Sequence, residues 1–221
     1  MVERARRYHR RMSRIILLNG SSSAGKTTLA LKLQQLLPEP WQHIALDQFR
    51  DGMPGRYRGF NSPSESPGAS GLNIVPTLRD GEALTEIRFG HHGEQMLAGM
   101  RRAIAAFARA GNNVIIDDLL FEPEYLHDYA EALRGIDTWF VGVRCSLDVV
   151  NEREARRVGR FPGTAESHFE QVHAHGVAYD LEVDTSSESP RTSAEAIVRR
   201  LEHPPVALQA ECGLDDSERQ P

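Results

Sequence analysis

The chain has 221 residues, of which 40% are hydrophobic and 26% are charged, as is ordinary for a globular protein of one α/β domain. Its formal net charge of −5 gives no general reason to expect nucleic-acid binding, and no apolar run is long enough to span a bilayer or to form a signal peptide. The two cysteines, Cys145 and Cys212, are too few for a disulfide framework or a zinc site, so we expect a cytoplasmic protein with no membrane partner.

The chain begins with a basic arm. Residues 1–14 contain six arginines and one acid, so this segment carries +5 and the remainder carries −10. Such an arm either contacts RNA, DNA or an anionic membrane or is a disordered extension, and we expect residues 1–13 to be disordered, with no nucleic acid bound. Met12, two residues before the first expected strand, is an alternative start of the chain.

Short apolar runs then alternate with helical patterns, which is typical of parallel strands joined by helical crossovers. We expect the first strand at 14–19, a helix over 26–37 ended by Pro38, and a second strand at 43–46 that closes at Asp47. Residues 53–80 are rich in Gly, Pro, Ser and Asn and predict a long loop with little regular structure.

A long helix is expected over about 82–110. Its clearest part carries Met96, Met100, Ile104 and Phe107 at helical spacing, a stripe that predicts packing against the core. The elements expected after it are a strand at 113–117, a helix from 123 to 135, a strand at 138–144, helices at 146–157 and 165–175, a strand at 180–183, a helix at 192–202 and a disordered tail over 203–221.

One motif carries most of the chemistry. Residues 20–27 match the pattern G-x-x-x-x-G-K-[ST], with an apolar strand before it and an amphipathic helix after it, as the pattern requires. Such a loop turns its backbone N–H groups around phosphate, and the helix N-terminus adds partial positive charge. The alternative is a chance turn of glycines and serines. The residues expected to bind ATP are Gly20, Ser21, Ser22, Ser23, Ala24, Gly25, Lys26, Thr27 and Thr28.

Within this loop, Lys26 would reach the β- and γ-phosphates and the Thr27 hydroxyl would ligate Mg²⁺. Two further metal ligands are expected at the end of the third strand, where Asp117 and Asp118 follow an apolar run. A carboxylate there holds magnesium directly or through water, and Asp117 is preferred over Asp118. The alternative is that these carboxylates only cap the segment that follows.

Asp47 is a candidate general base, because it follows the second strand at the sheet edge where ligands bind in open α/β sheets. The alternative is an N-cap for the segment after it. Arg153, Arg157 and Arg160 recur at steps of four and three and would stabilise phosphoryl charge in the transition state, unless they form a solvated face with local pairs such as Glu152 with Arg156. The histidines at 91, 92, 168, 173 and 175 lack the spacing of a metal site and predict structural roles.

Taken together, the residues resemble the chloramphenicol phosphotransferase-like family. The resemblance covers residues 15–200 in order and is carried by the blocks at 16–27, 37–41, 47, 108–111, 115–118, 139–145, 172–173, 176–177, 179–180 and 182–185. It implies an ATP-dependent O-phosphotransferase with a parallel sheet in the order 2-3-1-4-5. It also implies that Asp47 is the base and that Arg157 and Arg160, with Arg153 in register, are lid arginines.

We therefore expect an α/β protein of the kinase-like P-loop NTPase class, a three-layer α/β/α fold with a five-stranded parallel sheet. One domain should span 14–202, with an acceptor region at 53–80 and a lid region at 146–175. The stretch 56–78 departs from the family, which leaves the acceptor open: a chloramphenicol-like molecule, with antibiotic resistance as the role, or a sugar, nucleoside or nucleotide-sugar. A regulatory module that binds nucleotide without catalysis is the alternative of another class, and Asp47 favours an enzyme.

Overall fold

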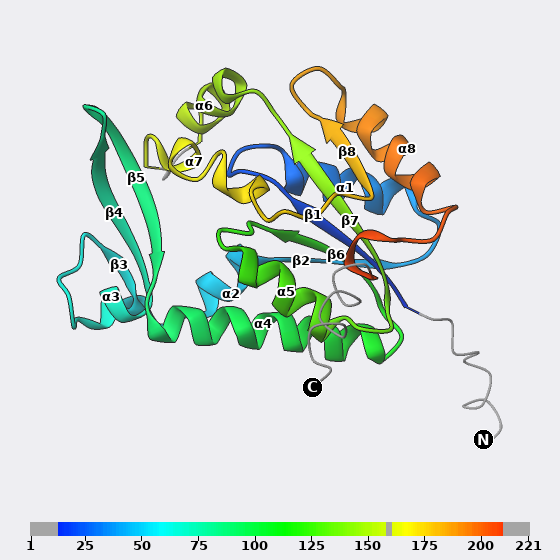
Figure 1. Cartoon of the computed structure of the whole chain (residues 1–221), viewed down its shortest axis with the longest axis horizontal. Coiled ribbons are helices and arrows are strands. Elements are labelled where there is room, and N and C mark those ends of the chain that lie inside the picture. Colours follow the sequence, from blue (N-terminus) through cyan, green and yellow to red (C-terminus); the bar gives the residue numbers. More distant parts are fainter. Residues whose placement is uncertain (1–12, 158–160, 210–221) are drawn as a thin grey trace, which may run out of the picture.

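The computed structural model describes residues 13–157 and 161–209 and has a parallel sheet at its centre (Figure 1). The five strands of this sheet are β1 (Arg14–Asn19), β2 (Trp41–Ala45), β6 (Asn113–Asp118), β7 (Asp137–Arg144) and β8 (Leu181–Asp184). They lie in the order β2-β6-β1-β7-β8. Counted along the chain within this sheet alone, that is the order 2-3-1-4-5, so the expected topology is confirmed; the labels jump because β3 to β5 form a separate sheet.

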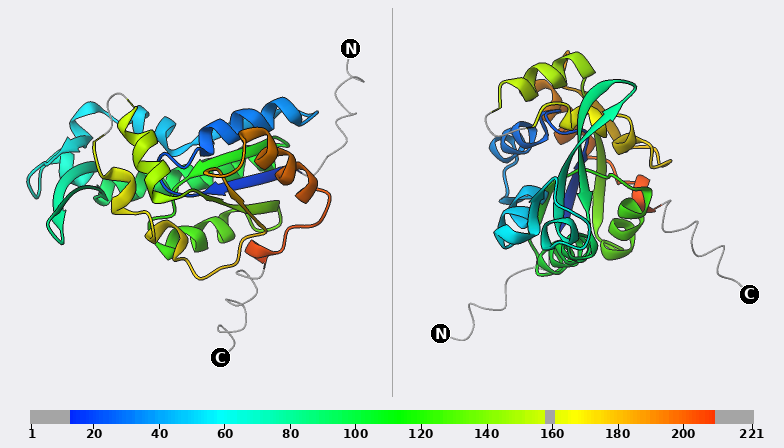
Figure 2. Two further views of the ribbon diagram at one scale, coloured as in Figure 1. Left: turned by 90° about the horizontal axis from the view of Figure 1, so that it is seen from above. Right: turned by 90° about the vertical axis from the view of Figure 1, so that its left-hand side faces the viewer.

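The two faces of the large sheet are both covered by helices, as the two views in Figure 2 show. Ile15 and Leu17 of β1 pack with α4 (His91–Arg109) and α5 (Pro123–Ala132) on one face. The residues between them, Ile16 and Leu18, pack with α1 (Lys26–Leu36) and α8 (Pro190–Arg200) on the other face. Burial on both faces explains why the strand is a continuous apolar run rather than an alternating one. Of the expected apolar stripe on α4, Met100 and Ile104 are buried, whereas Phe107 is 37% exposed.

The prediction of a loop over 53–80 is wrong, because this region and the following residues form a second, three-stranded sheet. Its strands are β3 (Arg58–Phe60), β4 (Leu72–Arg79) and β5 (Glu82–Phe89), in the order β3-β4-β5, with a 3-10 turn η2 (Gly55–Tyr57) before it and a short helix α3 (Pro67–Ser70) inside it. The strands β4 and β5 form an antiparallel hairpin that stands at one end of the molecule (Figure 1).

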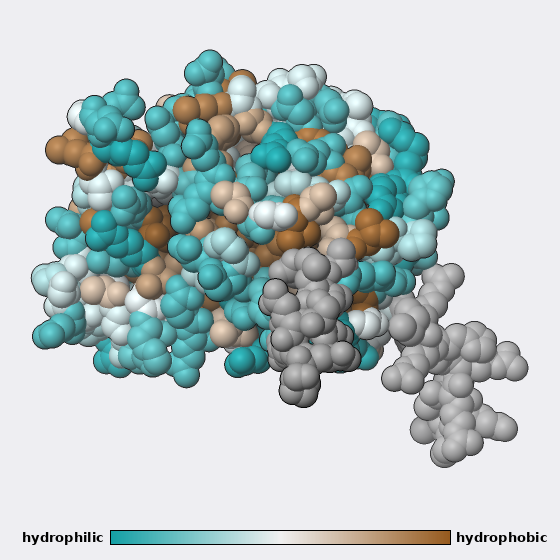
Figure 3. All heavy atoms as spheres, viewed as in Figure 1, coloured by the Kyte–Doolittle hydropathy of each residue, from teal (hydrophilic) through white to brown (hydrophobic). Residues whose placement is uncertain are grey.

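The hairpin turn also corrects the expected start of the long helix. Asp80 and Gly81 both have positive φ, at 53° and 88°, which is the conformation of a tight two-residue hairpin turn and the reason that an Asp-Gly pair suits it. The chain therefore returns as a strand over Glu82–Phe89, and the helix begins only at His91. Figure 3 shows apolar surface at this end of the molecule, where Leu78 is 78% exposed.

Three further boundaries differ from expectation. The second strand ends at Ala45, and residues Leu46–Gly52 form the short helix α2. The expected helix over 165–175 is a single turn, α7 (Thr164–Ser167), followed by a 3-10 turn, η3 (Gln171–His173), and α6 spans Leu147–Ala155. Glycines at 163 and 176, both with positive φ, flank this region and limit the helix.

The expected tail also starts too early. Ala207 and Leu208 are buried and belong to the core beside α4 and α5, and the indole nitrogen of Trp139 donates to the His203 carbonyl at 2.9 Å. Residues 203–209 are therefore part of the folded unit. Residues 1–12 of the basic arm, which include Met12, lie outside the described residues, as do Arg160 and residues 210–221 of the predicted tail, which include Cys212. Within the described ranges, no helix has the length and apolarity to cross a membrane.

Candidate active site at the carboxyl edge of the large sheet

A cavity of about 1280 Å³ opens where the strands of the large sheet end. One part is polar and is formed by the loop after β1, by Asp117 at the end of β6 and by Thr185 after β8. The other part is mostly apolar and is formed by α2, the second sheet and the segment after β6. In open parallel sheets this edge is the usual place for ligands, because the loops after the strands converge there.

The loop after β1 has the backbone of an anion-binding turn. Gly25, the N-cap of α1, has a φ of 95°, a region in which side chains with a Cβ are strained. At Gly20 a Cβ would lie 2.4 Å from the carbonyl oxygen of Val143, so the neighbouring strand β7 leaves no room for a side chain. The two glycines of the motif thus serve different needs, one conformational and one steric.

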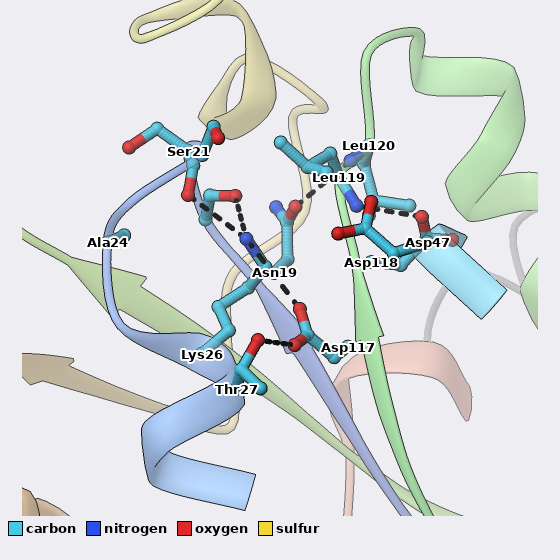
Figure 4. A network of polar contacts seen from close by, with 12 residues as sticks. Asn19, Ser21, Ala24, Lys26, Thr27, Asp47, Asp117, Asp118, Leu119 and Leu120 are labelled. Carbon is cyan, nitrogen blue, oxygen red and sulfur yellow. Dashed lines mark hydrogen bonds and ion pairs between the residues drawn. The ribbon is translucent and has the colours of Figure 1, made fainter. Parts of the chain in front are cut away.

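Lys26 is placed inside this loop. Its Nζ donates to the carbonyl oxygens of Gly20 at 2.8 Å and Ser21 at 3.0 Å, and the side chain is only 6% exposed. The same nitrogen lies 3.8 Å from Asp117 Oδ1. Figure 4 shows Lys26, Thr27 and Asp117 pointing toward one another. The cation is therefore already held at the centre of the loop, where it can exchange its carbonyl contacts for phosphate oxygens.

Asp117 and Thr27 form an oxygen donor pair. Thr27 Oγ1 donates to Asp117 Oδ2 at 2.6 Å, and His43 Nε2 lies 3.5 Å from the same oxygen. Burial alone would raise the pKa of Asp117, but the contact with His43, the charge of Lys26 and the Thr27 hydrogen bond together hold the pKa below its usual value. The carboxylate is therefore ionised, and a hydroxyl beside a carboxylate suits Mg²⁺, which prefers oxygen ligands and takes few from the protein when phosphates supply the rest.

Asp118 faces the other way, and the structure does not support its expected role as a magnesium ligand. Adjacent residues of a strand point to opposite faces, so Asp118 is directed to the side of α4 and α5. Its Oδ2 accepts from the Tyr129 hydroxyl at 2.7 Å and its Oδ1 from the Leu119 N–H at 2.8 Å. The side chain is 1% exposed and does not line the cavity, and this burial raises its pKa. Asp118 is thus a buried carboxyl group whose hydrogen bonds lie within the core.

Asp47 lines the cavity from the first turn of α2 rather than from a strand end. The N-cap of that helix is Ala45, so the capping role considered for Asp47 is not what the structure shows. Arg50 Nη1 donates to Asp47 Oδ1 at 2.7 Å, and Arg50 also pairs with Asp51 at 2.9 Å. With 44% of its side chain exposed, Asp47 is accessible to a molecule that enters the cavity.

The expected lid arginines have different positions. Arg153 is fastened beside the loop: its Nη2 donates to the Thr185 carbonyl at 2.7 Å and its Nη1 to Thr185 Oγ1 at 3.1 Å. Arg157 lines the cavity just beyond α6, and Arg160 lies outside the described residues. Arg156, which was not expected in the site, also lines the cavity and pairs with Glu152, as predicted for the solvated-face alternative.

The apolar part of the cavity was not predicted from the sequence. Its walls are the side chains of Leu46, Phe60, Leu72, Ile74, Ile87, Phe89, Leu119, Phe121 and Phe161. The rings of Phe60 and Phe161 stack with centroids 4.9 Å apart and so join β3 to the segment after Arg157. The Asp-Gly pair at 80–81 is the signal that could have revealed the hairpin and, with it, these apolar residues.

The histidines hold neighbouring segments together. His168 Nε2 accepts from the Ser22 N–H at 3.1 Å. His173 Nδ1 and His175 Nε2 lie 2.6 and 2.8 Å from the Tyr179 hydroxyl, which also accepts from Asn19 at the end of β1. Burial lowers the pKa of His173 to about 4, so that imidazole is neutral. Within residues 13–157 and 161–209, no three side chains of the metal-ligating types converge.

A parallel sheet in the order 2-3-1-4-5 with a phosphate-binding loop between its central strand and the first helix defines a phosphotransferase of the P-loop kinase class. The chain belongs to the chloramphenicol phosphotransferase-like family, which matches residues 13–202 and confirms the resemblance seen in the sequence. It is 33% identical over 184 residues to a Mycobacterium tuberculosis protein named "Putative O-phosphotransferase", across 79% of this chain and 76% of that protein. It is accordingly a phosphotransferase that acts on hydroxyl groups.

Solved structures support the fold. An APS kinase from Mycobacterium tuberculosis superposes with a TM-score of 0.59 at 15% identity, covering 87% of this chain and 99% of that one. A tunicamycin resistance protein from Deinococcus radiodurans gives 0.57 at 18%, covering 88% and 99%. A gluconokinase from Sinorhizobium meliloti gives 0.56 at 19%, covering 86% and 93%. At these identities the likeness concerns architecture alone.

Proposed function

We propose that this protein transfers the γ-phosphate of ATP, with Mg²⁺, to a hydroxyl group of a small uncharged molecule, chloramphenicol-like or related. The observation that carries the proposal is that Lys26, Thr27 and Asp117 meet at one end of a cavity whose other end holds Asp47 and an apolar wall. A nucleotide site that shares a cavity with an acceptor site and with a carboxylate able to act as base is what phosphoryl transfer to an alcohol requires.

The phosphate end would work through preorganised charge. The triphosphate would be held by N–H groups of the 20–28 loop other than those of Ser22 and Ala24, which already donate to His168 and to the Ser21 carbonyl. Lys26 would exchange the Gly20 and Ser21 carbonyls for phosphate oxygens. Thr27 and Asp117 would hold Mg²⁺, which neutralises charge on the phosphates. Arg157 lines the same cavity and adds positive charge there, while Arg153 holds Thr185, whose hydroxyl donates to the Ala24 carbonyl of the loop at 2.6 Å. Arg160 belongs to the same proposed set. Most of the rate enhancement then comes from positioning and electrostatics.

Asp47 would accept the proton of the attacking hydroxyl. To do so it must exchange its contact with Arg50, and Arg50 has a second carboxylate, Asp51, to which it can remain paired. The acceptor hydroxyl then lies between α2 and the phosphate loop. This arrangement distinguishes an enzyme from a module that only binds nucleotide, which needs no base there.

The character of the acceptor follows from the rest of the cavity. Its charged groups are largely balanced, since Arg50 and Arg58 lie beside Asp47 and Asp51, with Arg58 Nη1 3.8 Å from Asp51. Its walls are the leucine, isoleucine and phenylalanine side chains named above. A neutral, partly apolar alcohol matches such walls better than a sugar or a nucleotide-sugar, whose hydroxyls and phosphates would lose water without gaining polar partners.

Incubation of the protein with MgATP and a panel of acceptors, followed by mass spectrometry, tests the proposal. The panel should contain chloramphenicol, simpler aryl alcohols, a hexose, a nucleoside and a nucleotide-sugar. We expect a mass increase of one phosphate on a neutral aryl or alkyl alcohol. Phosphate transfer only to the hexose, nucleoside or nucleotide-sugar would reject the proposed acceptor class. Tight MgADP binding with no transfer to any acceptor would favour the regulatory module.

A further inference from the structure

The proposed reaction gives no role to His168, a buried titratable side chain beside the phosphate loop. His168 follows α7, is 3% exposed and accepts the Ser22 N–H at its Nε2, 3.1 Å away. A ring nitrogen that accepts a hydrogen bond carries no proton, so the imidazole is neutral and its proton is on Nδ1. Ser167 Oγ lies 3.4 Å from that Nδ1.

Ser22 belongs to the phosphate loop, and the direction of its N–H helps to set the shape of the loop. A buried N–H needs a partner, and the partner that it finds determines which way the peptide plane faces. Lys26 donates to the carbonyls of Gly20 and Ser21. His168, in the segment 164–173, accepts from the N–H of Ser22. Two consecutive peptide groups, Gly20–Ser21 and Ser21–Ser22, are thus held by two side chains.

His168 is itself held by the acceptor side of the cavity. Its ring meets the ring of Phe121 edge to face, with centroids 5.1 Å apart, and Phe121 packs against Phe89 of β5 at 5.7 Å. The turn before His168 is tied to the same sheet, because Thr85 Oγ1 donates to the Pro162 carbonyl at 2.8 Å and Arg79 Nη2 to the Ser167 carbonyl at 3.3 Å. The second sheet therefore fixes the position of His168 through this ring packing and these hydrogen bonds.

We propose that His168 is a positioning residue for the phosphate loop: it holds the Ser22 N–H in the orientation that triphosphate binding needs and joins the loop to the acceptor sheet. The inference rests on the proposed nucleotide binding, and it adds a residue that makes no contact with the reacting atoms. The proposed role of His168 depends on its accepting nitrogen, Nε2, rather than on the bulk of the ring. Substitutions that change one and keep the other therefore test the role.

Two substitutions separate the hydrogen bond from the packing. His168→Phe keeps an aromatic ring against Phe121 but leaves the Ser22 N–H without its acceptor, whereas the side-chain carbonyl of His168→Gln can replace Nε2. By calorimetry we expect His168→Phe to weaken MgADP binding about tenfold and His168→Gln to stay within about threefold of the wild type. Magnesium tripolyphosphate, used as a second probe, should show the same pattern, because it reports on the loop alone. The exposed His91→Phe is the matched control and should bind as the wild type does.

Equal binding by His168→Phe and the wild type would overturn the proposal, as would a loss in His168→Gln as large as that in His168→Phe. If His168→Phe fails to fold, ¹⁵N spectra of the wild-type imidazole decide the question, because a proton on Nε2 would exclude the contact with Ser22. If the wild type itself binds neither MgADP nor tripolyphosphate, the proposed function fails, and the same spectra still show whether the His168 contact exists.

Discussion

Thr27 Oγ1 and Asp117 Oδ2 lie 2.6 Å apart, although the two residues are separated by 90 positions in the chain. One stands in the first turn of α1 and the other at the end of β6, and the parallel pairing of β6 with β1 brings them together in register, with Leu18 opposite Asp117. The strand order is therefore what creates the oxygen pair proposed for magnesium.

Removing one member of that pair should weaken the response to magnesium. Thr27→Val keeps the shape of the side chain but loses the hydroxyl, so we expect at least about tenfold more Mg²⁺ to be needed for half-maximal transfer. Thr27→Ser retains the hydroxyl and should stay within about threefold. Titration of the transfer rate with Mg²⁺ at saturating ATP measures both, and identical Mg²⁺ dependence in Thr27→Val and the wild type would contradict the assignment.

Substitution of Asp118 should lower stability and leave the Mg²⁺ dependence unchanged, whereas substitution of Asp117 should change the Mg²⁺ dependence. Asp118→Ala leaves the Tyr129 hydroxyl and the Leu119 N–H without their acceptor inside the core, and we expect unfolding to become easier by about 2–4 kcal/mol, as chemical denaturation would show. The Mg²⁺ dependence of the folded variant should be unchanged. Asp117→Asn should instead alter the Mg²⁺ dependence, and because it removes the charge beside buried Lys26 it should also lose some stability. A reversal of the two patterns would show that the faces of β6 have been misassigned.

Asp47→Asn tests the base. The amide cannot take the proton of the acceptor hydroxyl, so we expect the transfer rate to fall by about 10²–10⁴ while the Kd for MgADP stays within about threefold. Asp51→Asn provides the matched control, because Asp51 pairs with the same arginine and lines the same cavity, and it should lose less than about tenfold. Transfer by Asp47→Asn at a rate near that of the wild type would remove Asp47 from the role.

The neutral His173 predicts how stability depends on pH. Its pKa is about 4 in the folded protein, against 6.5 as the ordinary value, so between these values the unfolded chain binds more protons. Stability from this group is therefore complete above about pH 6.5 and is lost as the pH falls toward 4, by an amount on the order of 2 kcal/mol for a half-buried group. Urea unfolding at pH 7, 6 and 5 should show this slope, and the slope should be smaller in His173→Gln. A slope that is equal in both proteins would assign the effect to other groups.

The sequence was informative wherever structure is determined locally. The glycine spacing of the phosphate loop, the apolar strand at 14–19 and the helix after it could be predicted, because each depends on neighbours within a few residues. The family resemblance supplied the strand order, and the parallel sheet confirms it. Asp117 could be named, with a slight preference over Asp118, because a strand end can be recognised, but which of the two carboxylates faces the loop depends on how the strand packs in the sheet.

The second sheet could not be predicted from composition, since its Gly, Pro, Ser and Asn residues are typical of loops. Its strands are stabilised by pairing across the chain, as when Leu72 of β4 pairs with Phe89 of β5 and with Arg58 of β3. Strand pairing of this kind depends on distant partners, which a local pattern does not contain. For that reason the apolar wall of the cavity was invisible in the sequence.

By itself, the sequence determined that this chain has a phosphate-binding loop and an acidic residue at the neighbouring strand end, because both are short patterns with a local physical cause. Only the tertiary structure decided which carboxylate faces the loop, which residues wall the acceptor half and that His168 contacts Ser22, 146 positions away. These relationships depend on which faces of distant elements meet, and that is set by the packing of the whole domain rather than by any segment alone.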